Sequence, residues 1–440
     1  MCVLPLIGNM FQFILGSTNT SSFYDLLIWQ RLGRAGRVAP GKCFRIYSRG
    51  QHEAMPERPL PEIQRSALEA TCLNTCTMTS DTVETFLSRA MDPPKSEAVS
   101  FSMDRLKKLG AISVGSSSAE TLTPLGQFLS RLPLDPAIGK MLIMGCVMQC
   151  LDPVLTAAVL ACSREVFFTP AGAREEQRKV RKSFDESSDT LASMRAYEEY
   201  QDVLRDKGWS DTKQWAYDNY VSMNAISSVH SIRQQLVNEL HRLGLVHNSD
   251  LDPRSRGRNK QLRPDAAVNR NAGVELLYTG VWACGAPDNL AARRRRGNFG
   301  TLRTRIENHS GLHPSSVAFH RKPPKGYTKP LPPWFLYREM VLSSQVFLRG
   351  CTSLSPEQAL LFGGYELSDQ GRSQKLIDDW IIVEGAQCSQ SLNVLSNVRR
   401  EINAALDLKV MNPRRPLPES QQLMIDAVGD CFDMLNDDDY

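Results

Sequence analysis

Three helix-start signals lying close together constrain the fold of this chain most. Thr123-Pro124, Asp135-Pro136 and Asp152-Pro153 each place a capping side chain directly before a proline. Such a side chain accepts hydrogen bonds from the first free N–H groups of a helix, and proline is favoured at the first helical position. Three such starts within residues 123–153 therefore predict short, closely packed helices with tight corners.

Two longer amphipathic helices are predicted after this segment. One begins at Ser188-Asp189 and carries apolar residues at helical spacing as far as Gly208. The other carries such residues from Ile226 to Leu243 and ends at Gly244, because glycine is favoured directly after a helix. This part of the chain is therefore predicted to be a helical bundle.

Helix, helix and hairpin follow one another upstream of these signals. Asp81 and Glu84 form a capping-box-like start for one helix, and Gly110 ends the next. Residues 111–114 and 120–123 flank a Gly-Ser-Ser-Ser turn, which predicts a β-hairpin. This order of elements is typical of a winged helix.

The composition becomes polar, basic and rich in proline and glycine from residue 250, which indicates a domain boundary. Short β-like runs then follow at residues 316–320, 335–337 and 345–348, and together they predict a small β-barrel. A helix is expected again over residues 391–408, before an acidic tail.

Positive charge is concentrated in the same region. Residues 250–333 hold sixteen Lys or Arg against six Asp or Glu, whereas the whole chain carries only +4. A concentrated basic segment suits a phosphate backbone, and the alternative is a solvated loop. The run Arg293–Arg296 also has two interpretations. It is either a solvated loop or a tract that contacts RNA or serves as an import signal.

Cysteine spacing and hydropathy limit the class of protein. The eleven cysteines form no C-x-x-C pair, and Cys72/Cys76 and Cys146/Cys150 are spaced as on one buried helix face. They are typical of reduced thiols in an intracellular protein, in the cytoplasm, the nucleus or an organelle, and they predict no metal site. No apolar run reaches membrane-spanning length, so a membrane is not an expected partner.

The octet QRLGRAGR at residues 30–37, continued by PGKCFRIY at 40–47, carries the most specific chemical signal. Glycine lets a backbone approach a ligand closely, and arginine offers a planar fork to phosphate oxygens. The stretch resembles motif VI of the DEAH/DExH-box ATP-dependent RNA helicases, which ends their second RecA-like lobe. The resemblance implies that Gln30, Gly33, Arg34 and Arg37 bind ATP, with Arg34 and Arg37 as catalytic arginine fingers.

The resemblance continues through most of the chain. It is carried by PEIQR at 61–65, DPP at 92–94, LGA at 109–111, LTPLG at 122–126, LDP at 134–136, GKML at 139–142, CLDPVLT at 150–156, HPSSV at 313–317, PW at 333–334, SP at 355–356 and LFGG at 361–364. Ser188-Asp189 resembles the family's SDH start of the ratchet helix, with Thr190 where His is usual.

The implied fold is mixed and mostly α. We expect a non-homologous leader at 1–29, the remnant of a RecA-like α/β lobe at 30–60 and a winged helix at 61–133. A helicase-associated ratchet bundle at 134–249, an OB-fold with a basic insertion at 250–365, and a C-terminal helical extension with an acidic tail at 366–440 complete the prediction.

Departures from the family pattern concern catalysis. Neither G-x-x-x-x-G-K-[ST] nor D-E-x-H occurs, and Gly41-Lys42 and Gly139-Lys140 precede side chains that have no hydroxyl for Mg²⁺. ATP and Mg²⁺ are therefore expected cofactors of an intact family member, whose N-terminal helicase lobes are missing partners of this chain. Alone, the chain is expected to need no cofactor and not to hydrolyse ATP. Residues 1–29 do not resemble the sequence that precedes this motif in the family. A mis-assigned start, a retained intron or truncation of a paralogue would each produce such a segment.

RNA, single-stranded or also structured, is the partner that the resemblance implies. OB-folds bind single strands with a basic groove and stacking surfaces. The expected contact residues are Ser188, Asp189, Arg303, Arg305, His313, Ser315, Ser316, Arg321 and Lys322. The alternatives are that Ser188-Asp189 is only a helix cap and that His313-Pro314 is only a turn.

Three functions remain open at this point. The first is the C-terminal portion of a helicase that couples ATP hydrolysis to 3′–5′ RNA unwinding in the intact protein. The second is a non-catalytic RNA-binding module. The third is a protein-docking scaffold, because winged-helix and OB surfaces in this family also bind protein activators. RNA affinity that falls steeply with salt separates the first two from the third.

Overall fold

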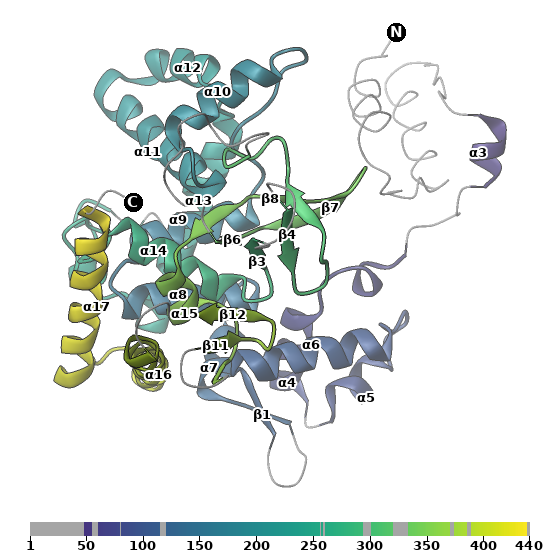
Figure 1. The fold of residues 1–440 in the computed structure, drawn as a ribbon, viewed down its shortest axis with the longest axis vertical. Coiled ribbons are helices and arrows are strands. Elements are labelled where there is room, and N and C mark those ends of the chain that lie inside the picture. Colours follow the sequence, from purple (N-terminus) through teal and green to yellow (C-terminus); the bar gives the residue numbers. More distant parts are fainter. Residues whose placement is uncertain are drawn as a thin grey trace.

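The computed structural model describes residues 48–54, 60–79, 81–114, 120–255, 257, 260–293, 301–319, 333–369, 374–384 and 389–437. Figure 1 shows the winged-helix elements at one end, several helices of the bundle at the other and a strand-rich domain between them. The leader at 1–29, motif VI at 30–37, Arg294–Arg296, Arg321 and Lys322 lie outside the described residues.

The first described domain has the predicted order of helix, helix and hairpin. After α3 (Arg49–Glu53) and η1 (Glu62–Gln64) come α4 (Glu69–Met78), α5 (Val83–Leu87), α6 (Ser96–Leu109), β1 (Ile112–Val114) and β2 (Glu120–Leu122). The hairpin is confirmed, with Ile112 opposite Leu122. The predicted start at Asp81 is wrong, because the hydroxyl of Thr82 accepts the hydrogen bond from the Thr85 N–H at 3.3 Å.

A helical bundle follows, as predicted. Helix α7 (Pro124–Leu129) lies between the hairpin and this bundle. The members of the bundle are α8 (Pro136–Val147), α9 (Leu151–Cys162), α10 (Arg174–Phe184), α11 (Asp189–Lys207), α12 (Trp209–Asp218) and α13 (Met223–Leu243), followed by η2 (Asn248–Asp250) and η3 (Ala267–Asn269). The glycine ends of α6 and α13 are confirmed, since Gly110 and Gly244 adopt φ of +83° and +85°, which favours glycine.

Two of the three cap-proline starts are confirmed. Thr123 accepts from the Gly126 N–H at 3.0 Å, and Asp135 accepts from the Ala137 N–H at 2.9 Å. The third is wrong, because α9 begins at Leu151, which is fully buried. Asp152 instead lies in the first turn of α9 and forms a 2.7 Å ion pair with Arg233 of α13.

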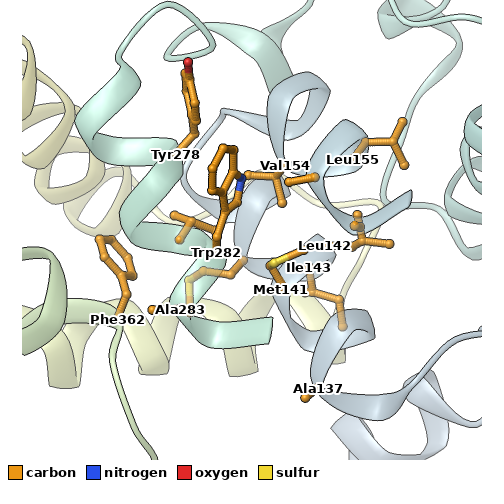
Figure 2. Close-up of a cluster of buried hydrophobic side chains, with 14 of the residues drawn as sticks. Ala137, Met141, Leu142, Ile143, Val154, Leu155, Tyr278, Trp282, Ala283 and Phe362 are labelled. Carbon is orange, nitrogen blue, oxygen red and sulfur yellow. The ribbon is translucent and has the colours of Figure 1, made fainter. Parts of the chain in front are cut away.

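The central core lies between α8, α9 and α14 (Glu275–Trp282). Both α8 and α9 are buried almost all round, as expected for helices that are apolar on every face. Figure 2 shows Met141 and Leu142 of α8, Val154 of α9 and Trp282 of α14 in this core. The helical bundle is therefore packed directly against the segment that leads into the strand-rich domain.

Seven strand segments form the main sheet, in the order β7-β8-β5-β4-β3-β6-β9. They are β3 (Leu290–Arg293), β4 (Thr301–Thr304), β5 (Ser310–Leu312), β6 (Trp334–Leu336), β7 (Glu339–Leu342), β8 (Val346–Arg349) and β9 (Thr352–Leu354). The predicted runs at 335–337 and 345–348 are confirmed as strand segments. The predicted run at 316–320 is wrong, because the Ser316 N–H bonds the His313 carbonyl at 2.8 Å in a turn.

This sheet closes into a barrel. Two residues separate β6 from β7 and two separate β8 from β9, so each pair is one continuous strand. Leu336 pairs with Thr352 and Glu339 pairs with Arg349, in one uninterrupted antiparallel register. The long strand β6–β7 and the long strand β8–β9 therefore pair with each other at both ends of the strand order. This pairing closes the sheet. Small and large apolar side chains fill the interior: Ala291, Leu302, Leu312, Phe335, Tyr337, Leu348 and Cys351.

The C-terminal part contains a small sheet that was not predicted. The helix η4 (Ala283–Gly285) precedes the barrel, and α15 (Pro356–Phe362) follows it. A three-stranded sheet of β10 (Leu367–Asp369), β11 (Gln374–Ile377) and β12 (Ile381–Glu384) comes next, and then α16 (Ser389–Met411) and α17 (Glu419–Asp437). Helix α16 confirms the predicted helix at 391–408. Ile425 and Phe432 of α17 are buried, and residues 438–440 at the acidic end lie outside the described residues.

Candidate nucleic-acid interface

The helical bundle and the barrel meet at the N-terminus of α11. The Ser188 hydroxyl accepts a 3.1 Å hydrogen bond from the Leu191 N–H, so Ser188 is the helix cap. The same hydroxyl lies 2.7 Å from the Thr352 hydroxyl of β9, and Ser188 has no exposed surface. The helix cap is thereby also a contact between the two domains.

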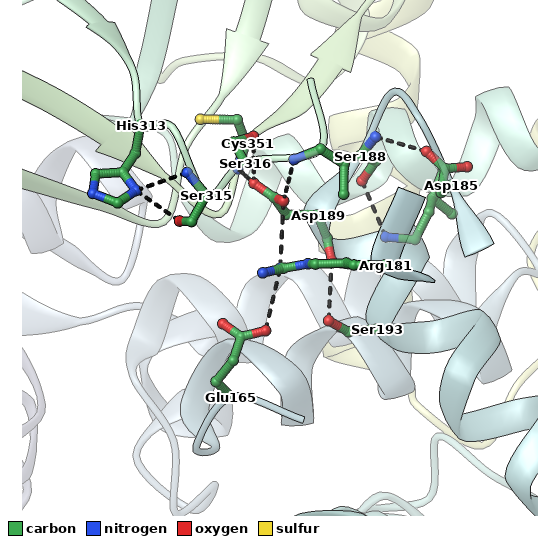
Figure 3. A network of polar contacts seen from close by, with 12 residues as sticks. Glu165, Arg181, Asp185, Ser188, Asp189, Ser193, His313, Ser315, Ser316 and Cys351 are labelled. Carbon is green, nitrogen blue, oxygen red and sulfur yellow. Dashed lines mark hydrogen bonds and ion pairs between the residues drawn. The ribbon is translucent and has the colours of Figure 1, made fainter. Parts of the chain in front are cut away.

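Asp189, the first residue of α11, is hydrogen-bonded to two separate segments of the barrel domain. Oδ2 accepts from the Ser316 hydroxyl at 2.7 Å and the Cys351 N–H at 2.9 Å, and Oδ1 accepts from the Val317 N–H at 2.9 Å. Arg181 of α10 lies 3.3 Å from Oδ1. Figure 3 shows these groups, which we call the Asp189 cluster, converging on one carboxylate.

The charge of the Asp189 carboxylate is compensated within the cluster. The side chain of Asp189 is 3% exposed, and a buried carboxylate costs several kcal/mol unless hydrogen bonds and an opposite charge compensate. Three donors and one guanidinium supply that compensation. The carboxylate therefore fixes the start of α11 relative to the turn at residues 313–319 and to the link between β8 and β9.

The predicted RNA contacts Ser188, Asp189 and Ser316 are buried in this interface between the domains. All three are 3% exposed or less, and each side chain is hydrogen-bonded within the protein. For Ser188 the structure shows the helix-cap alternative. RNA contact by these three residues stays a prediction.

His313 and Ser315 lie at the surface beside this cluster. His313 Nδ1 lies 2.6 Å from the Ser315 hydroxyl and 3.1 Å from the Ser315 backbone nitrogen, and Nε2 lies 3.1 Å from Arg349 Nη2. The His313 ring also meets the edge of Phe347, with centroids 5.6 Å apart. Burial, together with the neighbouring Arg349 guanidinium, lowers the pKa of His313 to about 4. The imidazole is therefore neutral at neutral pH.

Both ring nitrogens of His313 face donors. Arg349 carries only N–H groups and lies against Nε2, and the Ser315 backbone N–H donates to Nδ1 at 3.1 Å. The Ser315 hydroxyl lies 2.6 Å from the same Nδ1, and its role as donor or acceptor depends on the tautomer of the imidazole.

The remaining predicted contacts lie elsewhere on the barrel domain. The Arg303 guanidinium lies over the Trp380 ring at 5.8 Å, and Arg305 lies 3.6 Å from Asp288. Both arginines are exposed. The structure thus brings His313 and Ser315 together, whereas Arg303 and Arg305 belong to strand β4 and the turn that follows it.

Three family models match consecutive parts of this architecture. The helicase-associated (HA2) winged-helix model matches residues 102–134, and the ratchet-like HA2 model matches residues 135–204. The oligonucleotide/oligosaccharide-binding (OB)-fold model matches residues 281–365, which include the whole closed barrel. The chain has the C-terminal domains of the DExH/DEAH-box helicases.

Full-length relatives place this helicase region in context. It is 29% identical over 402 residues to the DExH-box ATP-dependent RNA helicase DExH1 of Arabidopsis thaliana, covering 91% of this chain and 38% of the relative. It is 30% identical over 399 residues to the ATP-dependent DNA/RNA helicase DHX36 of Mus musculus, covering 87% and 37%. For the ATP-dependent RNA helicase dhx29 of Xenopus laevis, the identity is 31% over 404 residues, covering 90% and 28%. The chain spans less than two fifths of these relatives.

Three basic residues of this helicase region were missed by sequence reasoning. Arg349 at the end of β8 holds His313, and Arg178 of α10 donates to the Phe319 carbonyl at 2.7 Å while lying over the Phe319 ring. Arg174 of α10 is close enough to contribute to the lowered pKa of His313. Helix α10 and strand β8 carry no motif, so only the fold could bring these residues to the turn at 313–319.

Other ligand classes find less support in the described part of this helicase region. None of its clusters of His, Cys, Asp or Glu could hold a metal ion, and its eight described cysteines are free thiols. Burial raises the pKa of both Cys72 and Cys146 to about 12. None of its described helices is both long enough and apolar enough to cross a membrane.

Proposed function

We propose that this chain binds single-stranded RNA as the C-terminal portion of an ATP-dependent RNA helicase. The observation that carries the proposal is the group formed by the half-buried His313 and Arg349 and the exposed Ser315 on the OB-fold, next to the buried Asp189 cluster. The relatives' names, which include RNA helicases, support RNA as the ligand.

The polar groups at this surface suit a phosphate backbone. Arg349 offers guanidinium N–H groups, Ser315 offers a hydroxyl, and Arg174 and Arg178 of α10 add positive charge beside them. Arginine forms forked, charge-assisted hydrogen bonds with phosphate oxygens. The neutral imidazole of His313 orients both neighbours without adding charge. RNA would therefore be bound mainly through its backbone here, with little selection among bases.

A second surface on the barrel can take a base. Arg303 lies over Trp380, and an arginine stacked on an aromatic ring offers a flat face on one side and N–H groups at its edge. A strand that contacts both surfaces would have phosphates at Arg349 and a base or phosphate at Arg303. Arg305 is partly neutralised by Asp288 and is expected to contribute less.

ATP hydrolysis belongs to the proposal only for an intact helicase. Gln30, Gly33, Arg34 and Arg37 would then meet the γ-phosphate of ATP, and ATP with Mg²⁺ would be held mainly by the two RecA-like lobes. The 440 residues contain no G-x-x-x-x-G-K-[ST], so we expect this chain alone to bind RNA without hydrolysing ATP. In the intact protein, RNA binding here would be coupled to 3′–5′ unwinding.

Fluorescence anisotropy with a labelled single-stranded oligouridylate, measured over a series of salt concentrations, tests the proposal. Four phosphate contacts would give a log–log slope of about −2.8. The double variant Arg303→Gln/Arg349→Gln should weaken binding and make the slope shallower by about 1.4. The double variant Arg205→Gln/Arg400→Gln, two exposed arginines on α11 and α16, is the matched control. Equal losses in both double variants would contradict the assigned surface.

A protein-docking scaffold is the second candidate. Trp209 and Tyr217 of α12 are exposed by 61% and 74%, and large exposed aromatic side chains are enriched at protein interfaces. Under this alternative, RNA affinity is weak and nearly independent of salt, and Trp209→Ala has no bearing on RNA. A flat salt dependence in the experiment above would favour this candidate over RNA binding.

A further inference from the structure

A pocket of about 230 Å³ lies between the helical bundle and the OB-fold. Its lining is largely apolar and includes Ile138 and Met141 of α8, Leu160 of α9, Trp282 of α14 and Leu336 of β6. Pockets for drug-sized ligands are roughly 300–1,000 Å³, so this one has room for a single ring system and not for a larger molecule.

Two buried polar atoms without partners belong to residues that line this pocket. Trp282 Nε1 and Arg181 Nε are buried and have no hydrogen-bond partner among the residues that the structure describes. Both atoms carry an N–H, and such donors suit a ring that offers acceptors, as every nucleobase does.

The charges around the pocket favour an anion. Its lining includes Arg164, Arg181 and Arg338 against Glu165 and Asp189. Glu165 is already contacted by Arg181 at 3.2 Å and by Arg338 at 3.6 Å, and Asp189 belongs to the buried cluster. Arg164 is exposed and forms no ion pair with the described residues. A phosphate near Arg164 and Arg338 would complete the balance of charge.

The pocket and the proposed RNA surface are built from neighbouring residues. Asp189 lines the pocket and also holds Ser316, which lies next to Ser315. Gly350 lines the pocket and directly follows Arg349, which contacts His313. The residues proposed to bind the strand are therefore next to pocket-lining residues in the chain or one hydrogen-bonded residue away from them.

We propose that this pocket takes one nucleotide of the bound RNA, with the base among the apolar side chains and the phosphate at Arg164 and Arg338. The inference rests on the proposed RNA binding and adds a defined subsite to it. Because both domains line the pocket, a base seated there contacts α9 and the barrel at once. Burying a base in it removes apolar surface from water and offsets the cost of unstacking that base.

Ligand-observed NMR and calorimetry with the full chain test the subsite. The probes are uridine monophosphate, adenosine monophosphate, the two nucleosides and inorganic phosphate. The expected result is that a nucleotide binds more tightly than its nucleoside and much more tightly than phosphate. Equal binding of phosphate and nucleotide would overturn the proposal, because the ring would then contribute nothing.

Three substitutions locate the binding site. Ala161→Leu fills the pocket from an exposed position of α9 and should abolish nucleotide binding without unfolding the chain. Arg164→Gln should weaken nucleotide binding about tenfold, the size of one lost charge-assisted hydrogen bond. Arg400→Gln, an exposed arginine of α16, is the control and should have no effect. Unchanged nucleotide binding in Ala161→Leu would overturn the location.

The outcome for oligouridylate separates this inference from the proposed function. If oligouridylate binds with the expected salt slope but nucleotides do not bind, the subsite is wrong and RNA binding stands. If neither binds, the proposed function itself is wrong. The nucleotide-bound chain is also challenged with oligouridylate and, separately, with a hydrophobic peptide. If oligouridylate displaces the nucleotide and the peptide does not, the pocket and the RNA surface form one site, as proposed. Displacement of the nucleotide by the peptide alone would assign the pocket to a protein ligand.

Discussion

The carboxylate of Asp189 accepts a 2.9 Å hydrogen bond from the backbone N–H of Cys351, a residue that lies 162 positions later in the chain. The Asp189 N–H returns a 2.8 Å bond to the Cys351 carbonyl. This reciprocal pair joins the first turn of the ratchet helix to the link between β8 and β9 of the barrel. The half-buried Arg349 directly precedes that link and contacts His313 at 3.1 Å.

Asp189→Asn is expected to loosen the contact between bundle and barrel. An amide keeps one acceptor but presents N–H groups to the Ser316 hydroxyl, the Cys351 N–H or Arg181, so one of them loses its partner. Breaking a buried charged contact of this kind costs about 3–5 kcal/mol.

Hydrogen exchange is the sharpest readout of this loss. The amides of Val317 and Cys351 should exchange much faster in Asp189→Asn, and thermal unfolding should occur at a lower temperature. Asp202→Asn, an exposed carboxylate on the same helix, is the control. Unchanged exchange at both amides would show that Asp189 does not hold the two domains together.

The protonation of His313 should depend on Arg349. Burial and the Arg349 guanidinium lower the pKa of His313 to about 4, so in the folded chain this imidazole should stay neutral down to about pH 5. The unfolded chain takes up that proton near the ordinary histidine pKa of about 6.5. His313 therefore makes the folded state progressively less stable as the pH falls from about 6.5 to about 4.

An NMR titration of the imidazole C–H signals measures this pKa directly. In Arg349→Gln the His313 pKa should rise, because a nearby positive charge that opposes protonation is removed. RNA affinity should show no His313-dependent step between pH 5.5 and 7.5 in the unsubstituted chain. A titration midpoint that is the same in both proteins would rule out the Arg349 contact in solution.

Arg34→Ala and Arg37→Ala test the assignment of motif VI. Each should leave RNA binding by this chain unchanged, because the proposed RNA surface lies on the OB-fold. In a longer form that contains the nucleotide-binding lobe, each should abolish ATPase activity, since an arginine finger contributes about 10³–10⁵ in kcat. Loss of RNA binding in Arg34→Ala would contradict this division of roles.

Arg321 and Lys322 are predicted to contact phosphate from the end of the turn at 313–319. Their positions lie outside the described residues, so the prediction rests on sequence and on their proximity in the chain to Ser315 and Ser316. Replacing both with glutamine should weaken RNA binding for all sequences alike. The slope of log affinity against log salt should become shallower by about 1.4. A loss restricted to certain sequences would indicate base contacts instead.

The sequence alone determined most of the helices and the family. Capping side chains and terminal glycines act within a few residues, so the starts at Thr123, Asp135 and Ser188 and the ends at Gly110 and Gly244 could be predicted from local chemistry. Asp152 shows the limit of such local signals. Burial of Leu151 and the ion pair with Arg233 moved the start of α9 upstream of the cap-like residue.

The tertiary structure decided which polar residues are available to a ligand. The stretch HPSSV at 313–317 does not indicate which of its polar residues are exposed. The fold buries Ser316 against Asp189 and leaves His313 and Ser315 at the surface. It also brought Arg349 to His313 from a strand with no motif. Exposure depends on contacts between segments far apart in the chain, and barrel closure through β6–β7 and β8–β9 depends on the pairing of whole strands. Such long-range pairings leave no local pattern in the sequence, and for that reason only the tertiary structure could separate the exposed polar residues from the buried ones.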